Sequence, residues 1–266
     1  MRQEIFKLRQ GAAPLLISMP HVGTLLPDDL KPAFSEVGLQ VDDTDWHVGE
    51  LYDFAGELGA SVIRPSYSRY VIDLNRPADG KSLYPGQNTT GLCPLTTFDN
   101  VPLYKPGMEP DEAEVARRLP LYWKPYHDAL QAELERIKSI HGYALLWDAH
   151  SIRSVIPHLF EGELPVFNFG TSSGASCAPG MGEMLLGQAR ELAPHYPAVL
   201  NGRFKGGYIT RNYGQPASRV HAVQLELAQR SYMQEQAPYA LDAALSARLK
   251  PVLRDLVKGY LAFKPS

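Results

Sequence analysis

Two histidines end two apolar runs of strand length in this sequence. His21 follows the run LISMP, and His150 follows LLWDA. Ligands bind at the carboxyl ends of the strands in open α/β sheets, so both side chains are expected at one edge of a sheet. Two histidines delivered there by different strands suit a catalytic zinc site, which has three protein ligands and one open position.

The third ligand is expected in the sequence DDTDWH, which begins at position 42. We predict a helix over residues 43–58, whose apolar stripe of Val48, Leu51, Ala55 and Leu58 faces the sheet. Asp45 lies three residues before Val48 and continues that stripe, so it is the predicted ligand. Asp43 is rotated away and better placed as an N-cap. Asp43 and His47 remain alternative ligands, and all the aspartates of this segment could instead complement the helix N-terminus.

Asp148 precedes His150 by two residues, so on a strand the two side chains point the same way. This spacing allows the Asp148 carboxylate to orient a ligand histidine from outside the metal site. The alternative is that Asp148 only caps the turn that follows.

A second motif, SRYVIDLNRP at positions 68–77, places Arg69 and Arg76 at the ends of a predicted short strand. The planar fork of arginine suits bidentate binding of a substrate carboxylate, and Asn75 adds amide donors. The alternative for either arginine is an ion pair with Asp73.

The run VHAVQLEL at positions 220–227 alternates so that Gln224 and Glu226 share one face of a strand. A carboxylate on the inner side of an apolar strand needs a partner or a role, and a general base acting on water at a metal site is such a role. The alternative is a buried ion pair with Arg203 or Arg211. Both arginines belong to the glycine-rich segment 201–211, which lacks the order of a phosphate-binding loop and is expected to place them around an anionic substrate.

The elements that position these residues alternate along the chain. Strands are predicted at 15–19, 61–64, 70–74, 143–147, 164–169 and 220–227. Helices are predicted at 43–58, at 110–141 with interruptions near Pro120 and Pro125, at 181–192 and at 239–261. Residues 80–110 are expected to form a long structured loop. The pattern predicts one α/β domain over residues 1–266, with a mostly parallel mixed sheet flanked by helices.

Composition excludes several classes of function. The 266 residues are 44% hydrophobic and carry a formal charge of −3, so they give no basic surface for nucleic acid. The sequence has no apolar run of about 18 residues that could cross a membrane. The polar start of the chain is unlike a signal peptide, and its two cysteines, Cys93 and Cys177, form no CxxC motif. We therefore expect a cytoplasmic protein whose metal ligands are histidines and carboxylates.

Several long segments resemble the N-formylglutamate amidohydrolase family, also called N-formylglutamate deformylases. They are PHVGT, DTDWHVGELYDFA, SRYVIDLNRP, LYPGQNTTGLCP, WDAHSIRSVIPHLFEG, NGRFKGGYITRNYG and AVQLELAQRSYM. The resemblance implies a zinc-carboxypeptidase-like (phosphorylase/hydrolase-like) fold. It also implies one zinc ion, with other divalent ions possible, and hydrolysis of N-formyl-L-glutamate to formate and L-glutamate in histidine degradation. The implied ligands are His21, Asp45 and His150.

In the same resemblance, Glu226 is the base, and Asn75 and Arg76 bind a carboxylate. The residues themselves suggest that Arg69 or a nearby cation stabilises the oxyanion together with the metal. Arg203 and Arg211 complete the predicted site for a small anionic acyl-amino-acid. Thr24 departs from the carboxypeptidase HxxE pattern, which would place an acid at that position. Two other functions are compatible with the residues. One is a different zinc amidohydrolase, such as an acyl-amino-acid deacylase or a peptidoglycan amidase, and the other is a non-catalytic carboxylate- or metal-binding protein.

Overall fold

A computed structural model describes residues 4–81 and 90–264 of the chain. Its strands form one seven-stranded sheet in the order β1-β3-β2-β4-β7-β5-β6. β3, β2, β4 and β7 run parallel, β1 is antiparallel to β3, and β5 and β6 run antiparallel to β7. The strand bounds are β1 (Phe6–Arg9), β2 (Leu15–Ser18), β3 (Ser61–Pro65), β4 (Ala144–Ile152), β5 (Phe167–Gly170), β6 (Ala198–Leu200) and β7 (Val220–Ala228).

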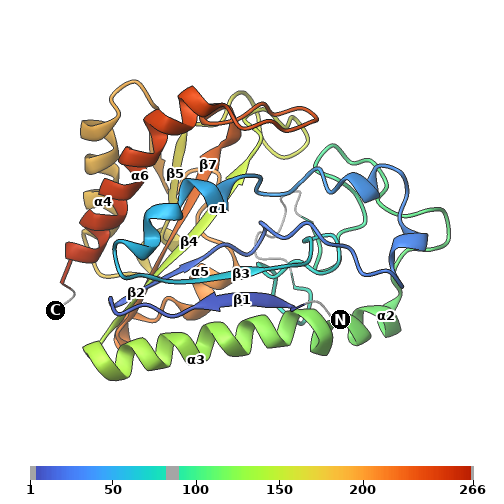
Figure 1. Cartoon of the computed structure of the whole chain (residues 1–266), viewed down its shortest axis with the longest axis horizontal. Coiled ribbons are helices and arrows are strands. Elements are labelled where there is room, and N and C mark those ends of the chain that lie inside the picture. The colour runs from blue at the N-terminus through green and yellow to red at the C-terminus, as the bar shows by residue number, and fades with distance from the viewer. Residues whose placement is uncertain (1–3, 82–89, 265–266) are drawn as a thin grey trace.

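Helices pack on both faces of this sheet (Figure 1). One face carries α1 (Val48–Leu51), α4 (Met181–Leu192) and α6 (Ala243–Ala262), and the other carries α3 (Lys124–His141) and α5 (Tyr208–Tyr213). A short helix α2 (Glu112–Arg118) and a π-helix η4 (Leu119–Trp123) precede α3. The 3-10 turns are η1 (Lys31–Ala33), η2 (Gly38–Gln40), η3 (Asp53–Gly56), η5 (Ser172–Gly174), η6 (Pro216–Ser218) and η7 (Gln229–Ser231).

The predicted α/β fold, with a mostly parallel mixed sheet flanked by helices, is therefore confirmed. In the part of the chain that the structure describes, no helix is long and apolar enough to cross a membrane.

The apolar core divides according to the alternation of the central strands. Leu15 and Trp147 point to the face covered by α4 and α6, whereas Leu16 and Leu146 point to the face covered by α3. All four side chains are fully buried. Burial of a side chain of this size contributes about 1.5–3 kcal/mol to the free energy of unfolding, so the central strands are firmly held.

On the α3 and α5 face, side chains become polar as the strands approach their carboxyl ends. Along β4, Leu146 is followed on this face by Asp148 and His150. The parallel register pairs Asp148 with Gln224 and His150 with Glu226 on β7. This change from an apolar to a polar face creates the place where a site can form.

The predicted helix over 43–58 is found only in part, although its apolar stripe of Val48, Leu51, Ala55 and Leu58 does pack in the core. Only α1 and η3 form there, because His47 has a φ of 60° in the left-handed region and ends any helix that approaches from Asp43. Tyr52, with φ −101° and ψ 23°, then separates α1 from η3. Asp45 therefore lies in a turn before α1 rather than on a helix, and His47 rather than Asp43 is the N-cap residue of α1.

The predicted strand at 70–74 is wrong, because residues 68–77 form successive turns. Local side-chain hydrogen bonds replace a strand ladder: Ser68 Oγ accepts from the Tyr70 N–H at 3.2 Å, and Asp73 Oδ1 accepts from the Asn75 N–H at 2.8 Å. β4 also extends beyond His150 to Ile152, so this histidine lies within the strand.

Other predicted elements are confirmed with small shifts. α4 has the predicted bounds, and the predicted interruptions of the helical segment 110–141 are found as the π-helix at Pro120 and the start of α3 at Pro125. Residues 80–81 and 90–110 contain no helix or strand, in line with the predicted loop, and residues 82–89 lie outside the described part.

His127 on α3 ties this helix to two other segments. Its Nε2–H donates to the Leu74 carbonyl oxygen, and its Nδ1 accepts from the Tyr213 hydroxyl, each at 2.9 Å. Trp123 stacks on the imidazole with ring centroids 3.8 Å apart. Burial lowers the pKa of His127 to about 4, so the ring is neutral at pH 7.

At pH values between the two pKa values of His127, the unfolded chain binds a proton at this residue and the folded protein does not. The folded protein is therefore expected to lose stability as the pH falls through this range. An unfolded histidine has a pKa of about 6.5, so the loss begins near that pH and is complete near the folded pKa of about 4. Between pH 7.5 and 5.0, His127 should account for about 2 kcal/mol of lost unfolding free energy.

A His127→Gln variant should therefore lose less stability than the wild type over this interval, in urea melts at the two pH values. The exposed His195→Gln variant serves as the matched control and should keep the wild-type pH dependence. An unchanged pH dependence in His127→Gln would contradict the role given to this ring.

Candidate metal centre and active site

Three residues from different segments meet at the carboxyl end of the sheet. His21 follows β2, Asp45 lies in the turn before α1, and His150 lies on β4, and one ligand atom from each falls within 4.8 Å of the others. Asp45 Oδ2 is 3.8 Å from His21 Nδ1 and 3.1 Å from His150 Nδ1. The Asp45 N–H donates to the His21 carbonyl oxygen at 3.0 Å, which fixes the turn against the end of β2. The structure thus brings together the three predicted ligands.

The outer nitrogen of each histidine faces a buried carboxylate. His21 Nε2 lies 2.7 Å from Asp73 Oδ1, and His150 Nε2 lies 3.1 Å from Asp148 Oδ2. Such carboxylates fix the ring orientation of metal-binding histidines and make the inner nitrogen a better ligand. Both Nδ1 atoms are therefore directed to the same point beside Asp45.

Asp73 holds more than one part of the site. Its Oδ1 accepts from the Asn75 N–H, and its Oδ2 accepts from Arg69 Nη2 at 2.6 Å. Although burial raises the pKa of Asp73, the positive charges of Arg69 and His21 hold it well below its usual range. One ionised carboxylate thus links a candidate metal ligand to an arginine of the pocket.

Asp148 is equally buried and lies beside two hydroxyl groups. Ser18 Oγ donates to its Oδ1 at 3.2 Å, and Thr210 Oγ1 donates to its Oδ2 at 3.3 Å. Burial lowers the pKa of His150, but Asp148 and Asp45 outweigh this effect and raise it well above its ordinary value. The same negative surroundings favour a bound cation.

Glu226 lies opposite His150 in the register of β4 and β7, with its side chain on the same face. Gln224 Nε2 donates to Glu226 Oε2 at 3.3 Å, while Gln224 Oε1 accepts from the Gly207 N–H at 2.7 Å. Burial raises the pKa of Glu226; His150 opposes this shift and Asp45 adds to it. A buried carboxylate with a raised pKa beside a metal-binding cluster is suited to accept a proton.

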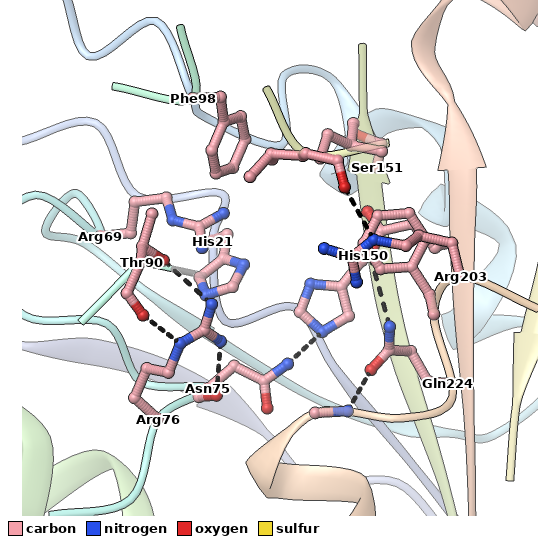
Figure 2. Close-up of a pocket in the computed structure, with 15 residues that line it drawn as sticks. His21, Arg69, Asn75, Arg76, Thr90, Phe98, His150, Ser151, Arg203 and Gln224 are labelled. Atoms are coloured by element: carbon pink, nitrogen blue, oxygen red, sulfur yellow. Dashed lines mark hydrogen bonds between the residues drawn. The ribbon is translucent and has the colours of Figure 1, made fainter. Parts of the chain in front are cut away.

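Several of these residues line a common pocket at the carboxyl end of the sheet. Figure 2 shows His21 and His150 between Arg69 and Arg76 on one side and Arg203 on the other. The pocket is lined by His21, Arg69, Asn75, Arg76, Thr90, Phe98, His150, Ser151, Ile152, Leu159, Arg203, Phe204, Gly207, Gln224 and Glu226.

The arginines differ in how the chain holds them. Arg69 pairs with Asp73 and lies 4.9 Å over the Phe98 ring, so the predicted alternative of an ion pair is present together with a place in the pocket. Arg76 donates through Nε to the Thr90 carbonyl oxygen and through Nη2 to Thr90 Oγ1. Arg211 lies on α5, where its Nε donates to the Gly206 carbonyl oxygen, and it does not line the described pocket. Its predicted contact with substrate stays a prediction.

The Asn75 side chain contacts both a candidate metal ligand and the backbone of α5. Its Nδ2 is 3.1 Å from His150 Nε2, and its Oδ1 accepts from the Ile209 N–H at 2.8 Å. The backbone of the following residue is supported from outside, because Trp123 Nε1 donates to the Arg76 carbonyl oxygen at 2.9 Å.

The two alternative ligands lie elsewhere. Asp43 Oδ2 accepts from the Phe98 N–H at 2.9 Å, so Asp43 supports the pocket wall. His47 has its Nδ1 against Glu50 and its Nε2 against the Tyr239 carbonyl oxygen. Neither belongs to the described group that can hold a metal ion.

Sequence reasoning missed the roles of Asp73, Gln224 and Phe98. Asp73 interrupts an apolar run, and Gln224 shares a strand face with Glu226, so both carried a signal of buried polarity. Phe98 lies in an irregular segment without hydrophobic periodicity, so the sequence around it gave no signal of a role in the pocket.

The donor set fits a divalent ion that prefers nitrogen and oxygen ligands. It offers two imidazoles and one carboxylate, and it faces a pocket from which a further ligand could approach. Sites with three protein ligands and one open position are typical of hydrolytic metal centres. A water activated at such a centre, beside a carboxylate base and several cations, can attack the carbonyl carbon of an anionic substrate.

Comparisons with known proteins agree with this chemistry. A family model described as N-formylglutamate amidohydrolase matches residues 13–233. An N-formylglutamate deformylase of Pseudomonas putida is 53% identical over 260 residues, covering 98% of this chain and 97% of its own. A crystal structure of N-formylglutamate amidohydrolase from Ralstonia eutropha has a TM-score of 0.79 and 26% identity, covering 96% of this chain and 97% of its own. A gene product of Agrobacterium tumefaciens, 16% identical with a TM-score of 0.73 over 98% of this chain and 96% of its own, shares the fold.

Removal of one ligand should remove bound metal. We expect His150→Ala and Asp45→Asn to lower the metal content per chain to a small fraction of the wild-type value, measured by elemental analysis after dialysis. Asp43→Asn is the matched control, because Asp43 is buried nearby but binds the Phe98 N–H. Metal loss in Asp43→Asn, with retention in Asp45→Asn, would place the ion elsewhere.

Proposed function

The chain belongs to the N-formylglutamate amidohydrolase family, and we propose that it hydrolyses N-formyl-L-glutamate to formate and L-glutamate. The observation that carries this proposal is the position of Glu226 across from His150, in a pocket lined also by His21 and cationic side chains. Asp45 lies beside the two histidines. The relatives named as deformylases, at 53% and 54% identity, support the same substrate.

The base in this reaction is Glu226. It accepts a proton from the attacking water as the water oxygen bonds to the formyl carbon. It then delivers that proton to the amide nitrogen as the carbon–nitrogen bond breaks, so formate and a free amino group are released. Gln224 keeps the Glu226 carboxylate oriented through the 3.3 Å hydrogen bond.

The proposed metal is zinc, held by His21, Asp45 and His150, although other divalent ions suit the same donors. When bound, a zinc ion lowers the pKa of water to about 7 and polarises a carbonyl oxygen. Arg69, which lines the pocket beside His21, is the candidate donor to the negative oxygen that develops on the formyl group. Its bond to Asp73 fixes the guanidinium before substrate binds.

Substrate carboxylates are bound by the cationic side chains of the pocket. Asn75 and Arg76 are the candidates beside the histidines, and Arg203 supplies a further cation. Binding energy from these contacts would orient the amide toward Glu226 and the candidate metal ligands.

Residues 1–266 are proposed to act as a single domain, because the site draws on both halves of the chain. His21, Asp45 and Asp73 come from the first half, and His150 and Glu226 come from the second. The free Cys93 and Cys177 support the proposed cytoplasmic location, since buried thiols persist in reducing compartments. A role in histidine degradation stays a prediction from the family resemblance.

The alternative functions are less well supported. A protein that only binds carboxylates or metals needs no buried glutamate beside the ligand cluster. A different zinc amidohydrolase activity would agree less well with the names of the two deformylase relatives, whose alignments with this chain cover 97% of their length.

Glu226→Gln should keep the fold and the metal but lower kcat by roughly 10²- to 10⁴-fold, the usual effect of removing a general base. The change keeps the side-chain volume and removes only the proton acceptor. Turnover of N-formyl-L-glutamate, metal content and thermal unfolding would be measured together. The exposed Glu183→Gln provides the matched control and should behave as the wild type. Near-normal turnover in Glu226→Gln would assign the proton transfer to another group.

Arg76→Lys should lower kcat/KM for N-formyl-L-glutamate by roughly 10- to 100-fold, although the positive charge is kept. Lysine cannot make the paired contacts that Arg76 makes with Thr90, so its ammonium group is not held in place for a carboxylate. Metal content should not change. An Arg76→Lys enzyme with wild-type kcat/KM would show that this fork does not bind the substrate.

A further inference from the structure

Cationic side chains line two opposite sides of the pocket. Arg69 and Arg76 lie on one side, Arg203 lies on the other, and the imidazoles of His21 and His150 lie between them (Figure 2). A substrate with a single carboxylate would need only one of these sides. The arrangement suits a dicarboxylate that spans the metal centre.

The side with Arg69 and Arg76 is linked to the metal ligands by hydrogen bonds. Asp73 bonds both His21 and Arg69, and the Asn75 amide reaches His150 at 3.1 Å. A carboxylate bound at Asn75 and Arg76 is therefore held next to the histidines. The substrate carboxylate that lies closest to the reacting amide is therefore expected to bind on this side of the pocket.

Arg203 is held by a different part of the chain, between β6 and α5. Its Nε donates to the Leu159 carbonyl oxygen at 3.0 Å, and its guanidinium carbon lies 5.3 Å from the centre of the Phe204 ring. Phe204 and Leu159 pack against the apolar cluster that includes Ile152, and all three side chains line the pocket. Arg203 thus projects from an apolar wall, and these two contacts fix the plane of its guanidinium.

N-formyl-L-glutamate has two carboxylates at unequal distances from the scissile bond. The α-carboxylate shares its carbon with the amide nitrogen, whereas the side-chain carboxylate is separated from that carbon by two methylene groups. We infer that Arg203 binds the side-chain carboxylate, while Asn75 and Arg76 bind the α-carboxylate. The apolar wall then contacts the methylene groups, so Arg203 sets the preference for an acidic side chain.

This inference rests on the proposed function and predicts an interaction between one arginine and one substrate charge. In Arg203→Met, kcat/KM for N-formyl-L-glutamate should fall about 10- to 100-fold, because a charge-assisted hydrogen bond is lost. For N-formyl-L-glutamine, which lacks that charge, kcat/KM should change less than about 3-fold. The preference of the enzyme for the acidic substrate should therefore nearly disappear.

Three further variants make the test specific. Arg76→Met should lower kcat/KM for both substrates by similar factors, since both have an α-carboxylate. Lys205→Met removes an exposed positive charge two residues from Arg203 and should leave both values unchanged. Arg203→Lys should retain part of the preference, and its thermal unfolding, with that of Arg203→Met, shows whether the fold is intact.

Equal losses for the two substrates in Arg203→Met would overturn the inference, as would a preference that disappears in Arg76→Met or Arg211→Met instead. Failure of the proposed function gives a different result, namely a metal-loaded wild type that hydrolyses neither N-formyl-L-glutamate nor N-formyl-L-glutamine.

Discussion

Concentrated negative charge in the protein interior is the constraint around which this site is arranged. Asp45, Asp73 and Asp148 are at most 1% exposed, and Glu226 is 7% exposed. A charge taken from water into such surroundings costs several kcal/mol unless it is paired and hydrogen-bonded. Arg69, the hydroxyls of Ser18 and Thr210 and the backbone N–H of Asn75 supply part of that compensation. The proposed divalent cation would supply most of the rest, which explains why so many polar groups converge on two histidines.

The sheet and its central residues could be predicted from the sequence because burial on both faces leaves a clear pattern. The apolar runs before His21 and within β4 were found, and the alternation of β7 placed Gln224 and Glu226 on one face. Asp45 does lie with the two histidines, but not for the reason that the helical pattern suggested. The expected helix is replaced by a turn, and the carboxylate is positioned by the backbone hydrogen bond to His21.

The rest could not be predicted because it depends on contacts between distant segments. The left-handed conformation of His47 and the turns of residues 68–77 are stabilised by neighbours, and these overrode the local helix and strand patterns. Asp73 could be recognised as an ion-pair partner of the arginines, but its bond to His21 joins residues 52 positions apart. Phe98 could not be identified from the sequence pattern. Its position beside Arg69 depends on the hydrogen bond from its N–H to the distant Asp43 carboxylate.

The π-helix between α2 and α3 links the length of one helical segment to the position of a side chain near the site. A π-helical turn is equivalent to an extra residue inserted into an α-helix, and such turns occur frequently at functional sites. Here the turn ends at Trp123, whose indole supports the backbone of Arg76. Deleting one residue would restore a regular helix and rotate this indole by about 100° away from its acceptor. A change in the length of this stretch would therefore remove the support of the Arg76 backbone even if every residue of the pocket were kept.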